Sequence, residues 1–367
     1  MFRISVRCLA VFLGGFALLT ILSGACVAAP AAAHNYRNAD FDYFVSGDPA
    51  APRAAHTERG YALMGGGGEV DAAFRFLAER AGHGHIVILR AASADDAYDP
   101  TDGDIDEDFV KRWGPVASAQ TIVFRSRAAA SDPRVLAVLH GADGIFLAGG
   151  DQSRYVNYWK GTPVNAALDA HVRANRPIGG SSAGLAILAG HGYTAMDGGS
   201  MESRVALADP FDSGMTLESD FLHFPGLEDL VTDTHFSARS RLGRLLAFVA
   251  RLRGEPGNAR VFGIGVDEKT ALLVGADGVG RLAQGSAGAA WVVLPAASAP
   301  ALEHGKPLSI ADWRLLRMNA ASRIDLASRT VEKPDAQATL SLVGGKLAKP
   351  SIAAPILQRA VTPPDES

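Results

Sequence analysis

The sequence PIGGSSAGLAILA, residues 177–189, is the most informative stretch of this 367-residue chain. A short apolar strand leads into G-x-S-x-G at residues 180–184, and a helix-like apolar run follows it. Small residues around a serine between a strand and a helix suit a sharp turn that lifts the hydroxyl above a sheet. The amides at the start of such a helix can face a developing oxyanion. Ser182 is therefore a candidate nucleophile, although the same motif also occurs in plain loops.

Short apolar runs alternate with helical patterns before this motif. Four of them predict strands, at residues 61–64, 85–89, 121–124 and 144–147. Residues 70–81 carry apolar side chains at helical spacing. This alternation predicts an α/β fold with a mainly parallel sheet that is covered on both faces. Because ligands bind beyond the carboxyl ends of such strands, we expect the breaks at Gly65, Gly149 and Gly180 to gather at one edge.

The pattern after residue 190 is looser. It predicts a strand at residues 230–233, an amphipathic helix at 239–253 and a further strand at 289–294. Residues 261–266 and 271–274 are expected to form a β-hairpin or adjacent strands. The chain has no visible internal repeat.

The first 33 residues have the pattern of a secretory signal peptide. Arg3 and Arg7 precede an apolar run at residues 9–22, and alanines between residues 28 and 33 offer cleavage sites. The run is short for a membrane span, so an uncleaved anchor is the weaker alternative. Residues 22–26, LSGAC, also approximate a lipobox. We expect an exported protein, periplasmic or extracellular, without stable membrane association after cleavage.

Composition narrows the classes of function. Both cysteines, Cys8 and Cys26, lie in the signal segment, so a mature chain beginning near His34 has no disulfide, catalytic thiol or Cys-ligated zinc. We expect neither a metal nor a cofactor. The formal charge of −4 and the lack of a long basic run argue against a nucleic-acid partner. We expect one domain over residues 34–345 and a loosely ordered tail over 346–367.

Gly149-Gly150-Asp151-Gln152 follows the strand predicted at residues 144–147. Glycines at this place let backbone amides face a ligand, and Gln152 adds a side-chain amide. The same residues also suit a tight strand-to-helix turn capped by Asp151. Local sequence leaves both interpretations open.

Asp233-Thr234-His235-Phe236 closes the strand predicted at residues 230–233. A histidine there can act as a base toward a serine on a neighbouring turn, although a lone histidine is more often structural. Arg239, Arg241 and Arg244 follow at the start of the predicted helix. Because cations oppose the macrodipole at this end, the placement favours an anionic ligand or a carboxylate partner. A solvated or salt-bridged helix face is the alternative.

A carboxylate is needed to orient His235. The acids between Ser182 and His235 offer many choices, namely Asp197, Glu202, Asp209, Asp212, Glu218, Asp220, Glu228, Asp229 and Asp233. A further glycine-bounded strand end with acids occurs at residues 263–271, and it reads equally as a plain turn between strands. Sequence does not choose among these acids on geometric grounds.

Four motifs taken together resemble the cyanophycinase branch of the cyanophycinase and dipeptidase E family of serine peptidases. They are Gly-Gly-Asp-Gln, G-x-S-A-G, D-x-H-F-x-x-R-x-R-x-x-R-L and G-I-G-x-D-E-x-T-A, in that order over about residues 64–274. The third motif is the specific one. The resemblance implies a three-layer α/β/α fold like that of class I glutamine amidotransferases, with extra strands toward the C-terminus. It also implies a homodimer.

The resemblance also implies roles for individual residues. Ser182 becomes the nucleophile and His235 the general base, with Glu202 preferred as the acid and Asp197 as its alternative. The substrate pocket then consists of Gln152, Asp233, Arg239, Arg241 and Arg244. Backbone amides near Gly150 and Ala183 would hold the oxyanion. One departure is Ser181, where the family commonly has threonine, and this change keeps a hydroxyl.

The function so implied is an exported serine peptidase that cleaves cyanophycin, a poly-aspartate carrying arginine on each β-carboxyl, into β-Asp-Arg dipeptides. Arginine forks suit the carboxylates of such a substrate. A periplasmic peptidase for other aspartyl or β-aspartyl peptides is the first alternative. A catalytically silent binding protein of the same fold is the second. An α/β-hydrolase esterase is weaker, because its histidine lies much farther along the chain.

Overall fold

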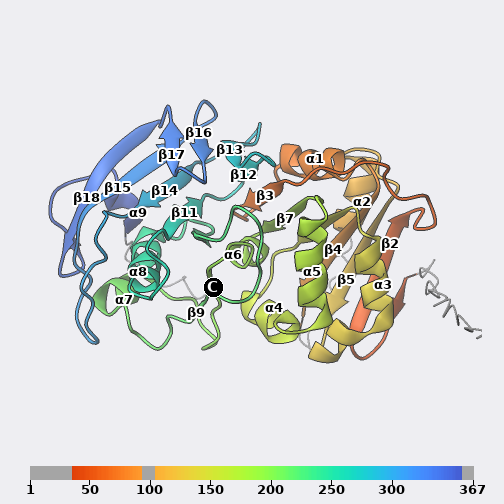
Figure 1. Cartoon of the computed structure of the whole chain (residues 1–367), viewed down its shortest axis with the longest axis horizontal. Helices are drawn as coiled ribbons and strands as arrows, with labels where there is room; N and C mark the ends of the chain where they lie inside the picture. The colour runs from red at the N-terminus through yellow and green to blue at the C-terminus, as the bar shows by residue number, and fades with distance from the viewer. Residues whose placement is uncertain (1–34, 93–103, 358–367) are drawn as a thin grey trace, which may run out of the picture.

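The computed structural model describes residues 35–92 and 104–357 of the chain (Figure 1). The predicted signal peptide, both cysteines and the last residues of the predicted tail lie outside these ranges. Two β-sheets organise the described part, with helix α6 (Ala183–Ala186) lying between them.

The first sheet has eleven strands in the order β1-β2-β5-β4-β6-β7-β3-β12-β13-β16-β17. Its five central strands are parallel to one another: β5 (Ser118–Phe124), β4 (His85–Ala91), β6 (Gly144–Leu147), β7 (Ile178–Ser181) and β3 (Tyr61–Met64). These are the strands that the apolar runs predict. The outer strands are antiparallel: β1 (Tyr36–Arg37), β2 (Phe41–Gly47), β12 (Ala271–Val274), β13 (Val279–Leu282), β16 (Arg323–Asp325) and β17 (Thr330–Glu332).

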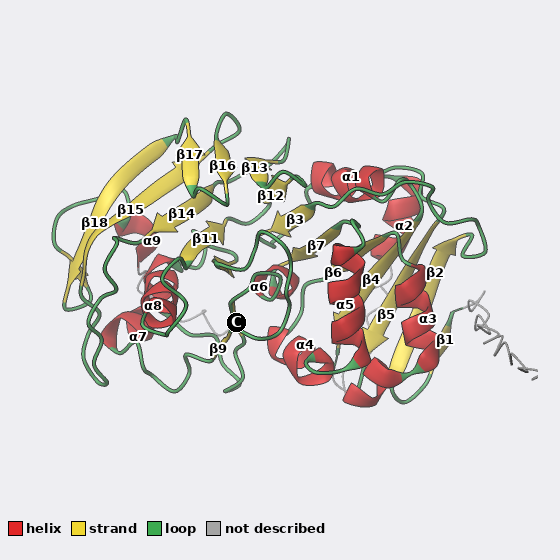
Figure 2. Ribbon diagram, viewed as in Figure 1, coloured by secondary structure: helices red, strands yellow, loops and turns green. Residues whose placement is uncertain are grey.

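Helices cover both faces of the parallel strands, as Figure 2 shows. Helices α1 (Asp71–Arg80) and α2 (Asp104–Lys111) pack on the face that Ile86 and Ile88 share. Helices α3 (Pro133–Gly141), α4 (Gln152–Trp159) and α5 (Pro163–Arg173) pack on the face of Val87 and Leu89. The expected three-layer α/β/α arrangement is thus confirmed, because alternate residues of one strand enter opposite cores.

The second sheet has six strands in the order β10-β11-β14-β15-β18-β19. Only β10 (Leu230–Asp233) and β11 (Phe262–Val266) are parallel within it. The antiparallel strands are β14 (Ala290–Leu294), β15 (Ile310–Met318), β18 (Ala336–Val343) and β19 (Lys346–Leu347). These are the extra strands expected toward the C-terminus. Helix α8 (Leu242–Arg253) packs on this sheet beside α7 (Ser203–Ala208) and α9 (Ala354–Leu357).

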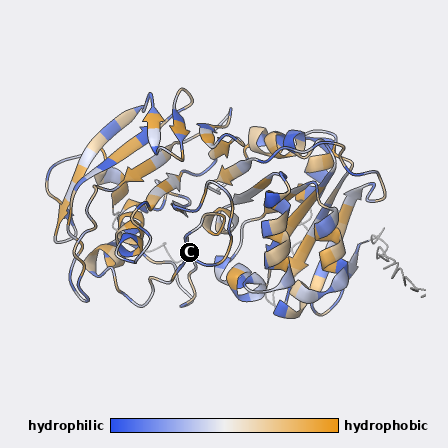
Figure 3. Ribbon diagram, in the orientation of Figure 1, coloured by the Kyte–Doolittle hydropathy of each residue, from blue (hydrophilic) through white to orange (hydrophobic). Residues whose placement is uncertain are grey.

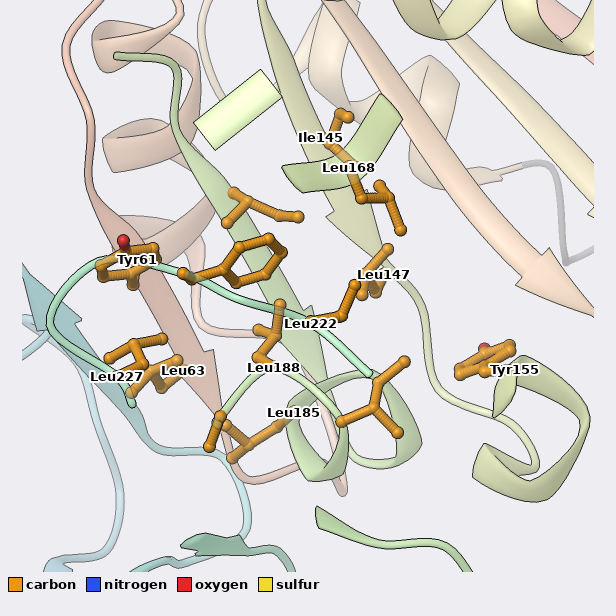
Figure 4. Packing of buried hydrophobic residues seen from close by; sticks show 14 of the residues in the cluster. Tyr61, Leu63, Ile145, Leu147, Tyr155, Leu168, Leu185, Leu188, Leu222 and Leu227 are labelled. Atoms are coloured by element: carbon orange, nitrogen blue, oxygen red, sulfur yellow. The ribbon is translucent and has the colours of Figure 1, made fainter. Parts of the chain in front are cut away.

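Hydrophobic residues follow the strands of both sheets, and the covering helices have mixed faces (Figure 3). The core between the sheets supports the turn after β7. Leu185 and Leu188 there are fully buried and share a cluster with Leu63, Leu222 and Leu227 (Figure 4). This packing fixes the short helix α6 that follows Ser182.

Three local predictions differ from the structure. The hairpin expected from residues 261–266 and 271–274 does not form, because β11 pairs with β10 and β14 while β12 pairs with β3 and β13. The four residues between them therefore cross from one sheet to the other. The helix after the serine is a single turn, since α6 ends at Ala186. The long helix begins at Leu242, so Arg239 precedes it.

Residues 346–357, the first part of the segment expected to be a loosely ordered tail, are paired or packed against the rest of the protein. Strand β19 pairs with β18, and Ala353, Ile356 and Leu357 are buried in the core beneath α8. Apolar burial holds this segment, which the Pro- and Ala-rich composition alone did not indicate. No helix within residues 35–92 and 104–357 has the length and apolar character that crossing a membrane requires.

A two-stranded ribbon completes the architecture near α6. It joins β8 (Gly192–Tyr193) to β9 (Leu217–Glu218). The loop inside this ribbon contains Asp197, Ser200 and Glu202. A short 3₁₀ helix at Arg127–Ser131 connects β5 to α3.

Candidate active site

Ser182 sits in a strained turn directly after β7. Its backbone has φ 53° and ψ −115°, a left-handed conformation that a residue with a Cβ rarely adopts. Such backbone strain costs roughly 1–3 kcal/mol and persists only where the surroundings impose it. The N–H of Ser182 donates to the carbonyl of Met64 at 3.1 Å. The turn therefore holds the hydroxyl above the carboxyl ends of β7 and β3.

Both glycines of the G-x-S-x-G motif are required by packing. A Cβ at Gly184 would lie 2.1 Å from the carbonyl oxygen of Leu147 on β6. A Cβ at Gly180 would lie 2.6 Å from the carbonyl carbon of Gly184 itself. Neither position has room for a side chain. The two glycines of the motif are therefore required because the turn packs closely on itself and on the neighbouring strand.

His235 comes from the other sheet, at the carboxyl end of β10. It also has a positive φ, 47°, and its N–H donates to the carbonyl of Gly65 at 2.8 Å. Its Nε2 lies 2.8 Å from the Oγ of Ser182. The predicted pairing of Ser182 with His235 is therefore present in the structure, across the seam between the two sheets.

The carboxylate that reaches His235 is Glu268. Its Oε1 lies 2.7 Å from Nδ1 of His235, so the Nδ1–H donates to Glu268 and leaves Nε2 to accept from the serine. Glu268 stands on the link between β11 and β12. Its neighbour Asp267 accepts from the backbone N–H groups of Ser237 and Ala289, which holds the link in place.

This geometry corrects the expected acid. Glu202 is about half exposed and pairs with Arg204 at 3.3 Å, away from His235. Asp197 is exposed in the loop between β8 and β9. Spacing after the serine pointed to these residues, whereas the fold brings an acid from beyond the histidine. The segment at residues 263–271 held the signal, because its two acids follow a strand that runs parallel to β10.

A run of glycines after β3 lies against the three polar side chains. A Cβ at Gly66, where φ is +87°, would lie 2.6 Å from Nε2 of His235 and 3.0 Å from Cβ of Ser182. A Cβ at Gly67 would lie 2.7 Å from the side chain of Glu268. A Cβ at Gly149 would lie 3.6 Å from Cβ of Ser182. The breaks at Gly65, Gly149 and Gly180 thus meet at one edge, as the alternating pattern predicts.

A cleft of about 290 Å³ opens beside Ser182. All five predicted substrate residues line it, as do Gly150 and Ala183. Asp151 accepts from the N–H of Ser153 at 2.9 Å and so caps helix α4, which begins with Gln152. The two interpretations of Gly-Gly-Asp-Gln are therefore compatible, because the capped turn itself borders the cleft.

Arg244 and Asp233 form a buried ion pair at the floor of the cleft. The guanidinium reaches the two carboxylate oxygens at 2.7 and 2.5 Å, a bidentate contact. Its remaining nitrogen donates to Ser200 Oγ and to the carbonyl of Met201. The nitrogens of Arg244 thus all donate to groups of the protein itself. Asp233 is a carboxylate partner of the kind that the sequence pattern of the arginines favours.

Arg241 is also buried, and its guanidinium forms hydrogen bonds with other groups of the protein. It donates to the carbonyl and the hydroxyl of Thr234, both at 2.9 Å. Burial, followed by the charge of Arg244, lowers the pKa of Arg241 to about 9, so it remains a cation at neutral pH. Arg239 differs, because it is exposed and its side chain has no hydrogen-bond or ion-pair partner within the described ranges.

The surroundings of His235 keep its imidazole neutral near pH 7. Burial lowers the pKa of His235, and the charges of Arg239 and Arg241 act in the same direction. The hydrogen bond that His235 donates to Glu268 opposes this shift without overcoming it. A neutral imidazole whose Nδ1–H is tied to a carboxylate can accept a proton at Nε2. Within residues 35–92 and 104–357, no three metal-ligating side chains gather at one place.

Comparisons with known proteins find peptidases. Residues 107–280 match the model of peptidase family S51. The cyanophycinase of Trichormus variabilis is 30% identical over 213 residues, which cover 56% of this chain and 65% of the relative. The cyanophycinase of Synechococcus elongatus is 31% identical over 168 residues, 46% of this chain and 47% of the relative. The chain thus spans less than two thirds of the length of these curated relatives.

Two solved structures resemble the chain at low sequence identity. A peptidase from an acI-B1 Actinobacterium has a TM-score of 0.49 at 15% identity, covering 74% of this chain and 98% of its own. A putative peptidase E from Listeria monocytogenes EGD-e has a TM-score of 0.40 at 14% identity, covering 59% and 95%.

The matched residues 107–280 include Ser182, His235 and Glu268, the three side chains joined by hydrogen bonds. The curated relatives are cyanophycinases, and the matching family model is that of a peptidase family. The serine, histidine and glutamate thus lie within the segment that matches peptidase family S51, and the chain is similar to curated cyanophycinases.

Proposed function

We propose that this chain is a serine peptidase that hydrolyses cyanophycin to β-Asp-Arg dipeptides. The observation that carries the proposal is the continuous hydrogen-bonded row Ser182–His235–Glu268 beside an arginine-lined cleft. Similarity to curated cyanophycinases supports the choice of substrate. The family resemblance of the motifs implies a homodimer, and the N-terminal pattern suggests export; both belong to the proposal.

The reaction begins when the Oγ of Ser182 attacks the peptide carbonyl while Nε2 of His235 takes the hydroxyl proton. Glu268 holds the imidazole in the tautomer with hydrogen on Nδ1 and stabilises the imidazolium that forms. His235 then gives the proton to the leaving amine, which leaves an acyl-enzyme on Ser182. Water, deprotonated by His235, releases the acid product and restores the serine.

The developing oxyanion needs donors close to Ser182. The amides of Gly150 and Ala183 are the proposed donors, since both residues border the cleft beside the nucleophile. The N–H of Ser182 is engaged with Met64 and does not serve. Removing one donor of this kind typically costs about 10²–10³ in kcat.

Recognition of the substrate falls mainly to Arg239. Arg244 and Arg241 are held by Asp233, Ser200 and Thr234, so they shape the positive floor of the cleft. Arg239 offers an exposed guanidinium to a substrate carboxylate. A backbone of aspartate units supplies such a carboxylate at each cleaved unit.

A second candidate keeps the chemistry and changes the substrate. One free arginine requires only one carboxylate, and short aspartyl or β-aspartyl peptides also supply it. A panel of α- and β-linked aspartyl peptides, assayed beside cyanophycin, separates the two. Faster turnover of the short peptides would assign the chain to them.

The direct test incubates the protein, beginning near His34, with cyanophycin and follows the released dipeptide. We expect release by the wild type and a loss of about 10⁴-fold or more in Ser182→Ala. A fluorophosphonate should label Ser182 in the wild type and leave the variant unlabelled. No release by the wild type, or equal release by the variant, would contradict the proposal. Absence of labelling as well would favour the silent binding protein.

A further inference from the structure

A second cavity lies at the far end of the six-stranded sheet. It has a volume of about 410 Å³ and is lined by Arg253, Ala259, Leu294, Pro295, Ala296, Ala297, Arg314, Ser328 and Arg329. Strands β10 and β11 run in parallel toward His235 and Glu268, and the cavity borders the loop that precedes β11. Leu294 ends β14 beside Arg314 of β15. This arginine cavity is therefore separate from the cleft at Ser182.

Its charge is unbalanced. Three arginines line the arginine cavity, and none of its described lining residues carries a carboxylate. A neighbouring arginine is balanced, since Arg260 pairs with Asp229 at 2.7 Å. By contrast, no carboxylate within residues 35–92 and 104–357 forms an ion pair with Arg253, Arg314 or Arg329.

Arg253 makes the imbalance costly because it is only 7% exposed. Its guanidinium donates to the carbonyls of Ala259, Ala296 and Ala297 at 2.5, 2.9 and 2.7 Å. Its Nε has no partner in the described part of the chain. Carbonyl dipoles orient the cation without neutralising it, and a buried cation without an anion is unfavourable. An anion in the cavity would offset that cost.

The other two guanidinium groups border the space that such an anion would fill. Arg314 is exposed and forms no side-chain hydrogen bond or ion pair within the described ranges. Arg329 donates once, to the carbonyl of Arg260 at 3.0 Å, from a left-handed backbone with φ 58°. Burial and then the charge of Arg329 lower the pKa of Arg253, which is consistent with the proximity of these two cations.

We propose that the arginine cavity binds a multiply charged oxyanion of the phosphate or polycarboxylate class. Guanidinium forks match the oxygen pairs of both groups, and two accessible forks over a buried third favour an anion with more than one charge. Recognition here is independent of the peptidase reaction, so this site stands or falls separately from the proposed function.

The test measures binding of inorganic phosphate and of citrate by calorimetry, with sodium chloride at matched ionic strength as the blank. The site variant is the double substitution Arg314→Gln and Arg329→Gln. The matched control is Arg173→Gln with Arg281→Gln, which removes the same charge from exposed positions on α5 and β13. Comparison of the two anions tells a phosphate site from a polycarboxylate site.

We expect saturable binding of at least one anion by the wild type and the control, and binding at least about tenfold weaker in the site variant. Peptidase activity should be the same in all three. If the double variant melts at a lower temperature without anion, the single variant Arg314→Gln, on an exposed strand position, replaces it. No saturable heat with either anion, or equal affinity in site variant and control, overturns the proposal.

Discussion

The turns after β7 and β10 reach the same result by different means. Ser182 and His235 both follow a strand of a parallel pair, and both have a positive φ, 53° and 47°. Each donates its N–H to a carbonyl at the end of β3, Met64 for the serine and Gly65 for the histidine. One strand end therefore anchors both turns.

The difference lies in where the glycines are. Ser182 has them in its own motif, because Gly180 and Gly184 pack against the turn and its neighbouring strand. The sequence of the turn around His235 contains no glycine. The glycine that makes room for this turn lies on the neighbouring strand β11. A Cβ at Gly265 would lie 2.3 Å from the ring of Phe236, which follows the histidine. The glycines that permit a sharp turn can thus lie in the turn itself or on a neighbouring strand. Only glycines in the turn itself form a local sequence motif.

The largest expected effect separates Glu268 from the acids that spacing suggests. Glu268→Gln should lower kcat by about 10⁴-fold, because the amide holds His235 in the wrong tautomer. Glu202→Gln, on the exposed pair with Arg204, is the matched control and should retain activity. Steady-state kinetics on a β-aspartyl peptide or cyanophycin decide. An inactive Glu202→Gln beside an active Glu268→Gln would return the role to Glu202.

The shared anchor after β3 is tested by Gly66→Ala. The new methyl would lie 2.6 Å from Nε2 of His235, and a displacement of about 1 Å in the histidine costs about 10²-fold in kcat. Gly226→Ala is the control, since its φ of +88° matches that of Gly66 at +87° and nothing lies within 4 Å of the new Cβ. Equal activity of the two variants would mean that backbone strain, rather than contact with the histidine, sets the effect.

The two kinds of arginine in the cleft should respond differently. Arg239→Gln removes an exposed guanidinium, so KM should rise by about tenfold or more with little change in melting temperature. Arg244→Gln removes the bidentate partner of the buried Asp233 and leaves it Arg241 at 3.6 Å, so the loss of stability should approach the roughly 3–5 kcal/mol of a broken buried ion pair. Kinetics together with thermal melts separate these outcomes. A stable Arg244→Gln with raised KM would give that residue a direct contact with substrate.

The smallest effect is on the pH profile. Burial lowers the pKa of His235, and protonation of this base stops the reaction, so kcat/KM should fall on the acid side only below the usual histidine range. Arg239 also lowers this pKa, so Arg239→Gln should move the acid limb upward. The same low pKa makes the unfolded chain bind the proton more tightly, and stability falls as pH drops through that window. An unmoved limb would show that Arg239 does not act on His235.

Sequence predicted the pairing of Ser182 with His235 because each lies directly after a strong apolar strand. It predicted the five parallel strands for the same reason. Glu268 was missed because four residues between two apolar strands look like a hairpin turn, and the choice of partner strand depends on pairing that local sequence does not encode. Had residues 262–266 been taken as the parallel neighbour of 230–233, the acids after them would have fallen beside His235.

The link between β11 and β12 has a consequence for how this chain can vary. It belongs to both sheets, since Asp267 is held by Ser237 and Ala289 while the N–H of Lys269 donates to Gly66. Because both ends of the link are fixed, its length sets the position of Glu268 relative to the two sheets. One inserted residue would shift Glu268 by about 3.3 Å while both sheets kept their own registers. Insertions are thus expected to be excluded from these four residues.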